Sequence, residues 1–274
     1  MTNLNPLGNP TEYPASYNAS LLYAIPRSQN RQRLGLVDGN LPFRGYDMWR
    51  AYEISWLDMN GKPVVAVGEI LVPAASPNMV ESKSFKLYLN SLNQERYENM
   101  QRVQELISKD VSLLAGTTAL VQLYSLRAFD ELQCTAPVGK SLDELDIVVD
   151  AYSPDASMLQ TLHEGIVEET LYSNLFRSNC PVTSQPDWGT VAINYRGAAL
   201  DHAGLLKYLV SFRSHNGFHE DCAELIFLDI MERAAPEQLS VTIHFLRRGG
   251  LEINPVRTSS LARFEFPAGR LLRQ

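Results

Sequence analysis

The chain has 274 residues, a length that fits one large domain or two smaller ones. Its residues are 45% hydrophobic and 20% charged, which is the composition of an ordinary soluble globular protein. Its formal net charge of −7 argues against binding nucleic acid through a bulk positive field, and its three cysteines lack the spacing of a disulfide framework or a zinc site. The sequence shows neither a membrane-length apolar run nor a signal-peptide pattern, so we expect a cytoplasmic protein.

The first half of the chain predicts an α+β module behind an irregular arm. Residues 1–44 are rich in Asn, Pro, Tyr and Arg without a sustained period, which indicates an arm that lies over the surface or over a partner subunit. An Asn-Gly turn at 60–61 between two β-rich runs predicts a hairpin. The elements predicted after the arm are strands at 46–57 and 64–72, helices at 80–91 and 94–110, a strand at 117–126 and a further strand at 146–151.

The second half predicts the same order of elements after a connection at about 127–160. Its predicted elements are strands at 166–176 and 189–195, helices at 205–212 and 218–234, and a closing hairpin at 239–246 and 250–253. A short internal repeat, 87–92 against 207–212, supports a duplication. We therefore predict two related α+β modules that pack sheet to sheet, with an arm at 1–44 and modules at 45–150 and 151–274.

The loop SNCPVTSQPDWG at 178–189 holds a thiol and a carboxyl seven residues apart, framed by two prolines. Because each proline pushes the residue before it out of helical conformation, Cys180 and Gln185 should be extended or in a turn. A thiolate adds to electrophilic carbon and a carboxyl transfers protons, so Cys180 and Asp187 suit covalent addition followed by protonation. On these residues alone, a buried inert cysteine and a turn-forming aspartate are the commoner alternative.

The segment ESKSFK at 81–86 places two lysines three residues apart at a helix start. Hydroxyls, free backbone N–H groups and the positive end of the helix dipole make this a candidate phosphate site. The commoner alternative is a helix start capped by Ser82 or Ser84, with both lysines in water. Glu81, just ahead of the helix, could instead face a ligand.

Two later segments offer polar groups for a ligand. His219 and Glu220 open a predicted helix, and a carboxylate can accept the two parallel N–H donors of a guanine-type ring, although the helix dipole alone also favours Glu there. Cys222 falls on the apolar stripe of the same helix, which predicts a core position. The RRGG run at 247–250 suits a phosphate or ribose contact, but it is also typical of an ordinary hairpin turn.

Taken together, these segments resemble the NADPH-dependent 7-cyano-7-deazaguanine reductases, the nitrile reductases of queuosine biosynthesis, in their long two-module form. The resemblance covers nearly the whole chain. It is carried by four motifs in the family's order: ESKSFKLY at 81–88, SNCPVTSQPDWG at 178–189, SFRSHNGFHEDC at 211–222 and RRGGLEINP at 247–255. It implies an α+β tunnelling fold, in which two tandem ferredoxin-like modules with antiparallel sheets associate between subunits into a barrel, here expected as a homodimer.

The resemblance also implies a role for each motif residue. Cys180 would add to the nitrile carbon to form a covalent thioimide, and Asp187 would donate a proton. The implied substrate-binding residues are Val80, Glu81, Ser82, His219 and Glu220. The implied NADPH-binding residues are Ser82, Lys83, Arg248 and Gly249. The chemistry requires no metal, and neither a stable nucleic-acid partner nor a membrane partner is expected.

The implied reaction is consistent with the side-chain chemistry. A nitrile accepts hydride poorly until a nucleophile and a proton reach it, and two hydrides, hence two NADPH, then give the primary amine 7-aminomethyl-7-deazaguanine. Two alternatives stay open: an amidine-forming enzyme that acts on the same nitrile in tRNA, and a purine-like ligand-binding protein on this fold without catalysis. The ESKSFK segment and the acidic charge count against the first, and the pairing of Cys180 with Asp187 counts against the second.

Overall fold

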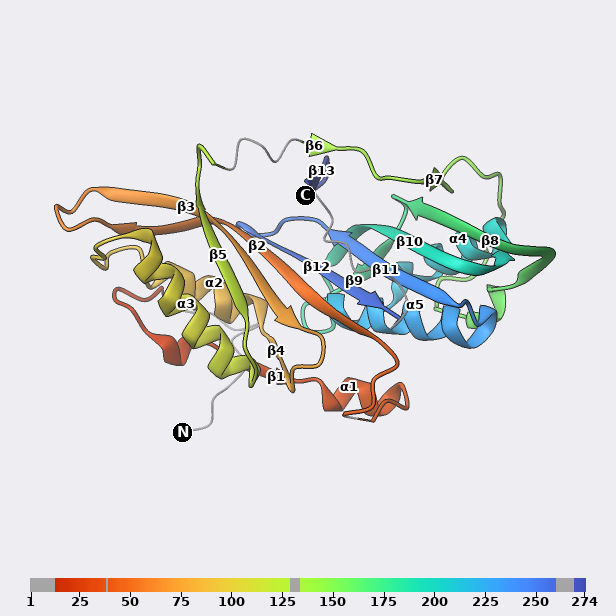
Figure 1. The fold of residues 1–274 in the computed structure, drawn as a ribbon, viewed down its shortest axis with the longest axis horizontal. Helices are drawn as coiled ribbons and strands as arrows, with labels where there is room; N and C mark the ends of the chain where they lie inside the picture. Colours follow the sequence, from red (N-terminus) through yellow and green to blue (C-terminus); the bar gives the residue numbers. More distant parts are fainter. Residues whose placement is uncertain (1–12, 38, 129–133, 260–268) are drawn as a thin grey trace. The chain divides into compact units, whose positions relative to one another are not determined.

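The computed structural model describes residues 13–37, 39–128, 134–259 and 269–274, in which the chain forms two compact units (Figure 1). Unit 1 comprises Met1–Leu41, Tyr46–Leu132 and Arg247–Glu252, and unit 2 comprises Pro42–Gly45, Gln133–Leu246 and Ile253–Gln274. Both units combine helices with long antiparallel strands, so the predicted α+β class is confirmed. Among the described residues, no helix has the length and apolarity needed to span a membrane.

Unit 1 is built on an antiparallel sheet with two helices on one face (Figure 1). Its main elements are β2 (Arg44–Leu57), β3 (Pro63–Pro73), α2 (Ser82–Asn90), α3 (Met100–Ala115) and β5 (Leu120–Ser125). The predicted hairpin is confirmed as β2 and β3, whose turn is fixed because Oδ1 of Asp58 accepts the N–H groups of Asn60 and Lys62, each at 2.9 Å. On the sheet, buried Trp49 packs edge-on against Phe85 of α2.

The helix α3 begins six residues later than position 94, where the sequence placed it, and ends five residues after 110. Its start is set by Asn99, which accepts the N–H of Arg102 through its side chain at 2.9 Å, and its end by Gly116 in left-handed conformation with φ 72°. The residues just before this cap are not helical, and Arg96 among them forms an isolated β-bridge with Leu57, so the predicted helix start was too early.

The segment predicted to be an irregular arm contains short regular elements. They are η1 (Ala19–Leu21), β1 (Ala24–Pro26) and α1 (Ser28–Arg33), and β1 pairs antiparallel with β4 (Asn78–Val80) just ahead of α2. No strong periodicity marks such short elements in a sequence, because they are stabilised by contacts with the rest of unit 1.

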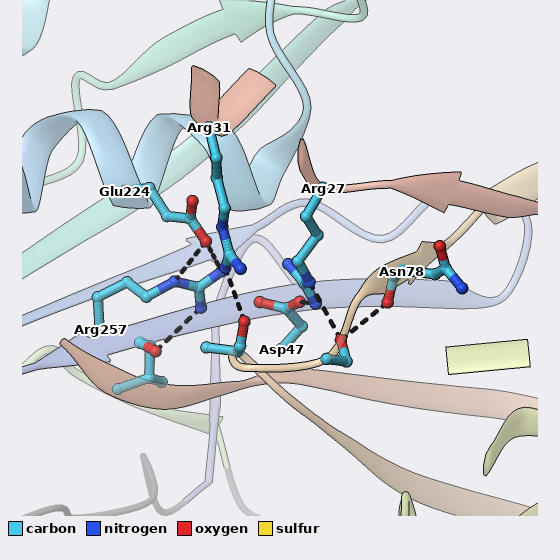
Figure 2. A network of polar contacts seen from close by, with 9 residues as sticks. Arg27, Arg31, Asp47, Asn78, Glu224 and Arg257 are labelled. Atoms are coloured by element: carbon cyan, nitrogen blue, oxygen red, sulfur yellow. Dashed lines mark hydrogen bonds and ion pairs between the residues drawn. The ribbon is translucent and has the colours of Figure 1, made fainter. Parts of the chain in front are cut away.

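Two buried arginines hold this segment within unit 1 (Figure 2). Arg27 pairs with Asp47 of β2 and donates Nε to Ser76 Oγ at 3.1 Å, and Arg31 donates Nη2 to the carbonyl of Ala74 at 2.6 Å. Removing one member of a buried ion pair costs about 3–5 kcal/mol, because the other charge is left in the interior. The segment around α1 is therefore anchored by polar contacts with defined partners.

Unit 2 has a larger antiparallel sheet in the order β12–β11–β10–β8, with the short β7 paired parallel to β8. Its main elements are β8 (Thr161–Ser173), β9 (Arg177–Asn179), β10 (Pro186–Leu200), α4 (His202–Ser211), α5 (His219–Ala234), β11 (Gln238–Phe245) and β12 (Leu251–Thr258), whose first two residues belong to unit 1. The short elements are β6 (Cys134–Thr135), β7 (Lys140–Ser141), η2 (Ala156–Met158), η3 (Phe212–Ser214) and β13 (Arg270–Leu271). The helix α5 packs on β11.

A buried ion pair joins a helix to a strand within unit 2. Arg257 of β12 donates Nη2 and Nε to Oε1 of Glu224 on α5, at 2.9 and 3.1 Å (Figure 2). Its guanidinium also lies over the ring of Phe43. Both charged side chains are buried, so this contact fixes α5 against the sheet.

The strand predicted at 146–151 is wrong, because these residues are irregular. Its apolar run is only three residues long between carboxylates, and Val148 is 81% exposed, so the segment has no buried face to form. The strands at 166–176 and 189–195 are confirmed as β8 and β10, but β8 both starts and ends earlier than predicted, and β10 extends further at both ends.

Candidate active site

The cysteine loop is a tight connection between β9 and β10. The N–H of Cys180 donates to the carbonyl of Gln185 at 2.8 Å, and the N–H of Ser184 donates to the carbonyl of Cys180 at 3.0 Å. Ser184 has a positive φ of 55°, a conformation that non-glycine residues adopt at a cost. The loop therefore holds Cys180, which is 6% exposed, in a fixed turn.

The pairing of β9 with β10 brings the start of the cysteine loop beside Asp187. Ser178 lies opposite Asp187 in the antiparallel register, and Cys180 follows Ser178 by two residues. Side chains two apart on a strand share a face, and diagonal neighbours across an antiparallel pair are within reach of each other. Asp187 is 1% exposed, so its carboxyl belongs to the interior of unit 2.

A second segment is hydrogen-bonded to the cysteine loop. The N–H of Asn179 donates to the carbonyl of His215 at 2.8 Å, and the N–H of Gly217 donates to the carbonyl of Asn179 at 3.1 Å. Burial lowers the pKa of His215, so its ring is neutral near pH 7. Because residues 215–217 lead directly into α5, these bonds position the start of that helix beside Cys180.

His219, the first residue of α5, faces Asp187. Its Nε2 lies 3.3 Å from Asp187 Oδ2, and its ring stacks on Phe245 with centroids 3.7 Å apart and an interplanar angle of 6°. Within the described residues, the buried Nδ1 of His219 has no hydrogen-bond partner. The structure thus brings His219 to Asp187, a contact that the spacing of the two residues in the sequence does not reveal.

Acidic groups gather around the first turn of α5. Glu220 and Asp221 lie in the first turn of α5, which has no side-chain cap, and there the helix dipole favours negative charge. Glu220 is 4% exposed. Burial raises the pKa of Cys222, the neighbouring Ser178 hydroxyl opposes this rise, and Asp221, Asp187 and Glu220 raise the pKa further. Cys222 is fully buried, as predicted, and it stays a neutral thiol.

The helix start of the ESKSFK segment differs from both sequence interpretations. Glu81, which is 1% exposed, caps α2 by accepting the N–H groups of Lys83 at 2.8 Å and Ser84 at 2.7 Å. The hydroxyl of Ser84 instead donates to the carbonyl of Glu81 and accepts the N–H of Tyr23. A phosphate site that relies on free N–H groups of Lys83 and Ser84 is therefore wrong, and any anion contact there must use side chains.

The RRGG run forms a turn that lies against α2 within unit 1. The N–H of Arg248 donates to the carbonyl of Leu251 at 2.9 Å, and Gly249 has a φ of 59°. A Cβ added at Gly249 would lie 3.2 Å from Cδ and Cε of Lys86, so the turn and the lysine stem are neighbours. Arg247 lies over the ring of Tyr52 at 4.6 Å. Two predicted motifs, ESKSFK and RRGG, thus meet in this unit.

The predicted site residues fall into two groups. Unit 2 holds Cys180, Asp187, His219 and Glu220, and unit 1 holds Val80, Glu81, Ser82, Lys83, Arg248 and Gly249. The sequence interpretation missed Phe245, whose ring faces His219; only its place in an alternating buried strand hinted at an inward side chain. In the part of the chain that the structure describes, no three His, Cys, Asp or Glu side chains group as metal ligands.

Two family models and a solved structure match parts of the chain. A family model described as "Nitrile reductase, 7-cyano-7-deazaguanine-reductase N-term" matches residues 13–123, and one described as "QueF-like protein" matches residues 186–263. Among solved structures, the apo form of the archaeosine synthase QueF-Like aligns with 36% of this chain and 96% of that chain, at 24% sequence identity and a TM-score of 0.31.

Relatives with curated names match over almost the full chain. The NADPH-dependent 7-cyano-7-deazaguanine reductase of Dechloromonas aromatica (strain RCB) is 54% identical over 258 residues, which cover 94% of this chain and 91% of that protein. The protein of the same name from Bordetella avium (strain 197N) is 52% identical over 255 residues, 93% of each chain. On this identity and coverage, the chain belongs to the NADPH-dependent 7-cyano-7-deazaguanine reductase family.

Proposed function

We propose that this chain reduces the nitrile of 7-cyano-7-deazaguanine to the primary amine 7-aminomethyl-7-deazaguanine with NADPH, in queuosine biosynthesis. The names of its relatives and the two matching family models support the reaction. The observation that carries the proposal is the contact between Asp187 and His219 beside the loop that presents Cys180. This contact supports a site in unit 2 in which Cys180 is the nucleophile, Asp187 the proton donor and His219 the group beside the donor.

Cys180 acts as the nucleophile in this proposal. Its thiolate adds to the nitrile carbon, a C–S bond forms as one π bond of the nitrile opens, and Asp187 protonates the nitrogen to give a thioimide. His219, 3.3 Å from the Asp187 carboxyl, holds the carboxyl in place and returns a proton to it after each transfer. Burial of Asp187 and Cys180 keeps water away from the carbon–nitrogen bond.

The residues of unit 1 suit a dinucleotide phosphate. Lys86 lies against the turn at Gly249, and Lys83 and Arg248 come from the same two segments, so cationic side chains meet a backbone that a ligand can approach closely. NADPH, when bound, supplies the hydrides. We assign Ser82, Lys83, Arg248 and Gly249 to its binding, with the lysine and arginine acting through their side chains.

Substrate recognition is assigned to both motif groups. Glu220 carries a buried carboxylate that can accept parallel N–H donors from a guanine-type ring, and the buried Nδ1 of His219 offers a further polar contact. Val80, Glu81 and Ser82 complete the assigned set. The capping bonds of Glu81 fix its carboxylate, and each of its oxygens keeps a second lone pair for a ligand donor.

The assembly proposed for this chain follows from the family resemblance. It comprises an arm at 1–44, modules at 45–150 and 151–274 of ferredoxin-like form, and a homodimer whose subunits close a barrel. We propose a cytoplasmic location and no stable nucleic-acid partner, consistent with the acidic net charge and the absence of a disulfide-type cysteine pattern.

The proposal is tested by following NADPH absorbance with and without the nitrile and by identifying the amine product. We expect oxidation of two NADPH per amine, only when the nitrile is present. Intact-mass measurement without NADPH should show one added substrate mass on each active chain. An amidine product formed on tRNA would favour the amidine-forming alternative, and binding without any mass increase or turnover would favour a non-catalytic binding protein.

A further inference from the structure

The short segment at 270–274 is hydrogen-bonded into the interior of unit 2. Gln274 is 5% exposed, and its Oε1 accepts the N–H of Leu271 at 2.8 Å. Its Nε2 donates to Oδ1 of Asn254 on β12 at 2.8 Å. A buried side-chain amide with both ends bonded is a fixed structural link, because breaking either bond leaves a polar group unsatisfied.

The link continues from Asn254 to the candidate active site. The same Oδ1 of Asn254, which is fully buried, accepts the backbone N–H of Phe245 at 3.2 Å. The ring of Phe245 is the surface on which His219 stacks, and His219 faces Asp187. Four contacts therefore connect Gln274 to the proton donor through Asn254, Phe245 and His219.

A second contact of the same segment reaches the strand that carries Asp187. Nη2 of Arg273 donates to the carbonyls of Asn174 at 2.5 Å and Gly189 at 2.9 Å, and lies 3.4 Å from Oγ1 of Thr190. Gly189 is two residues after Asp187 on β10. Arg273 is exposed, so its contribution is weaker than that of the buried Gln274.

We propose that Gln274 is a positioning residue for the reductase site, with Arg273 as a weaker second support. Gln274 fixes Asn254, Asn254 fixes the backbone of Phe245, and the Phe245 ring sets the plane in which His219 meets Asp187. This inference rests on the proposed function, because it assigns the effect of the segment to the proton-transfer step at Asp187. Gln274, Asn254 and Phe245 exert this effect without contacting the substrate themselves.

The main test compares Gln274→Ala and Gln274→Met in the full chain. A displacement of about 1 Å at a reacting group can cost about 10²-fold, so we expect kcat to fall about tenfold for this more remote change while KM stays within about twofold. The methionine variant keeps the side-chain length and removes only the hydrogen bonds, so it guards against loss of folding in the alanine variant. Leu272→Ala, at a neighbouring position that is 83% exposed, is the matched control and should leave kcat unchanged.

Two further measurements separate positioning from general destabilisation. The double variant of Gln274→Met with Phe245→Leu should lose little more kcat than Phe245→Leu alone, because both changes act along one path. The ring protons of His219, assigned by their loss in His219→Asn, should move in the NMR spectrum of Gln274→Met, since the ring current of Phe245 depends on the stack.

The outcomes are distinct. Unchanged kcat and an unmoved His219 resonance in both Gln274 variants would overturn the inference, as would a double variant in which the two losses multiply. If the unsubstituted protein oxidises no NADPH with the nitrile, the proposed function fails, and the His219 resonance then decides alone whether Gln274 sets the ring.

Discussion

In each unit, the same kind of hydrogen bond, from a tyrosine on the first helix to an aspartate on the second, links a pair of helices; we call it the tyrosine joint. In unit 1, the hydroxyl of Tyr88 on α2 donates to Asp110 Oδ2 on α3 at 2.8 Å, and in unit 2 the hydroxyl of Tyr208 on α4 donates to Asp229 Oδ2 on α5 at 2.5 Å. Burial and the neighbouring carboxylate raise the pKa of both tyrosines. Two helix pairs with the same joint at equivalent places indicate a duplicated scaffold.

The ends of these helices repeat as well. A carboxylate caps the first helix of each pair, Glu81 for α2 and Asp201 for α4. A serine after the last turn of α2 and in the last turn of α4 donates its hydroxyl to the carbonyl of the tyrosine three residues earlier, Ser91 to Tyr88 and Ser211 to Tyr208, each at 2.6 Å. The faint sequence repeat at 87–92 and 207–212 therefore corresponds to equivalent structure.

The units differ in the connection between their first two long strands. In unit 1, β2 and β3 are joined by a short turn at 58–62, whereas in unit 2 the segment between β8 and β10 adds β9 and the Cys180 turn. The helices are common to both units, but the proposed nucleophile, Cys180, and the proposed proton donor, Asp187, lie in the longer connection of unit 2 and the strand that follows it. The difference indicates that chemistry was placed in a loop while the scaffold was kept.

Removing the nucleophile gives the largest expected effect. Cys180→Ala should lower turnover by on the order of 10³-fold or more, because loss of an attacking group leaves only binding and polarisation. The adduct in the intact-mass measurement should disappear as well. Cys134→Ala, at an exposed cysteine on β6 and outside the β8–β10 connection, is the control and should keep full activity. Turnover that survives Cys180→Ala would break the assignment of chemistry to the longer connection.

The proton donor gives the next largest effect. Asp187→Asn keeps the shape of the side chain but cannot donate an acidic proton, and general acid catalysis contributes about 10²–10⁴-fold. We expect a loss of kcat in that range with KM little changed, measured by steady-state NADPH oxidation. An unchanged kcat would show that another group protonates the nitrogen.

Much of this arrangement follows from local sequence signals, and the remainder depends on tertiary contacts. The Asn-Gly hairpin, the helices predicted at 80–91 and 205–212, and the turn between the two prolines of the cysteine loop have short-range causes that sequence reasoning detects. The stacking of Phe245 on His219 joins residues on different elements, and no spacing encodes it. The capping by Glu81 was missed because Ser and Asp are the commoner caps, so Glu81 was considered only as a ligand contact.

The tyrosine joints give a smaller effect that sharpens the comparison of the two units. Tyr208→Phe should lower the free energy of unfolding by about 1–2 kcal/mol, because Asp229 loses its donor in a half-buried place. Tyr88→Phe should cost less, since Asp110 keeps the hydroxyl of Tyr17 at 2.7 Å. Urea unfolding of both variants measures the difference, and equal losses would contradict the role of Tyr17.

The pH dependence of Tyr208→Phe has a defined sign. Burial raises the pKa of Asp229 above its ordinary 3.8, and the Tyr208 hydroxyl offsets part of this rise. Without the hydroxyl the folded-state pKa rises further, so the ionised form becomes costlier. The stability lost in the variant should therefore be small below pH 3.8 and grow as pH increases through the folded-state pKa of Asp229. A loss that shrinks with rising pH would contradict this coupling.

The smallest effect concerns the ends of α3 and α5, where the units use different residues for the same conformation. Gly116 ends α3 with φ 72°, and Ala235 ends α5 with φ 42°. An L-residue in left-handed conformation costs about 1–2 kcal/mol. Glycine removes this strain, but the larger conformational entropy that it gives the unfolded chain offsets part of the gain, so Ala235→Gly should stabilise the protein by up to about 1 kcal/mol. The reverse change, Gly116→Ala, should destabilise it by more, because the new Cβ would also lie 2.6 Å from Pro77 Cγ. Thermal unfolding of the two variants should show opposite shifts, and shifts of the same sign would mean that the two helix ends are not equivalent.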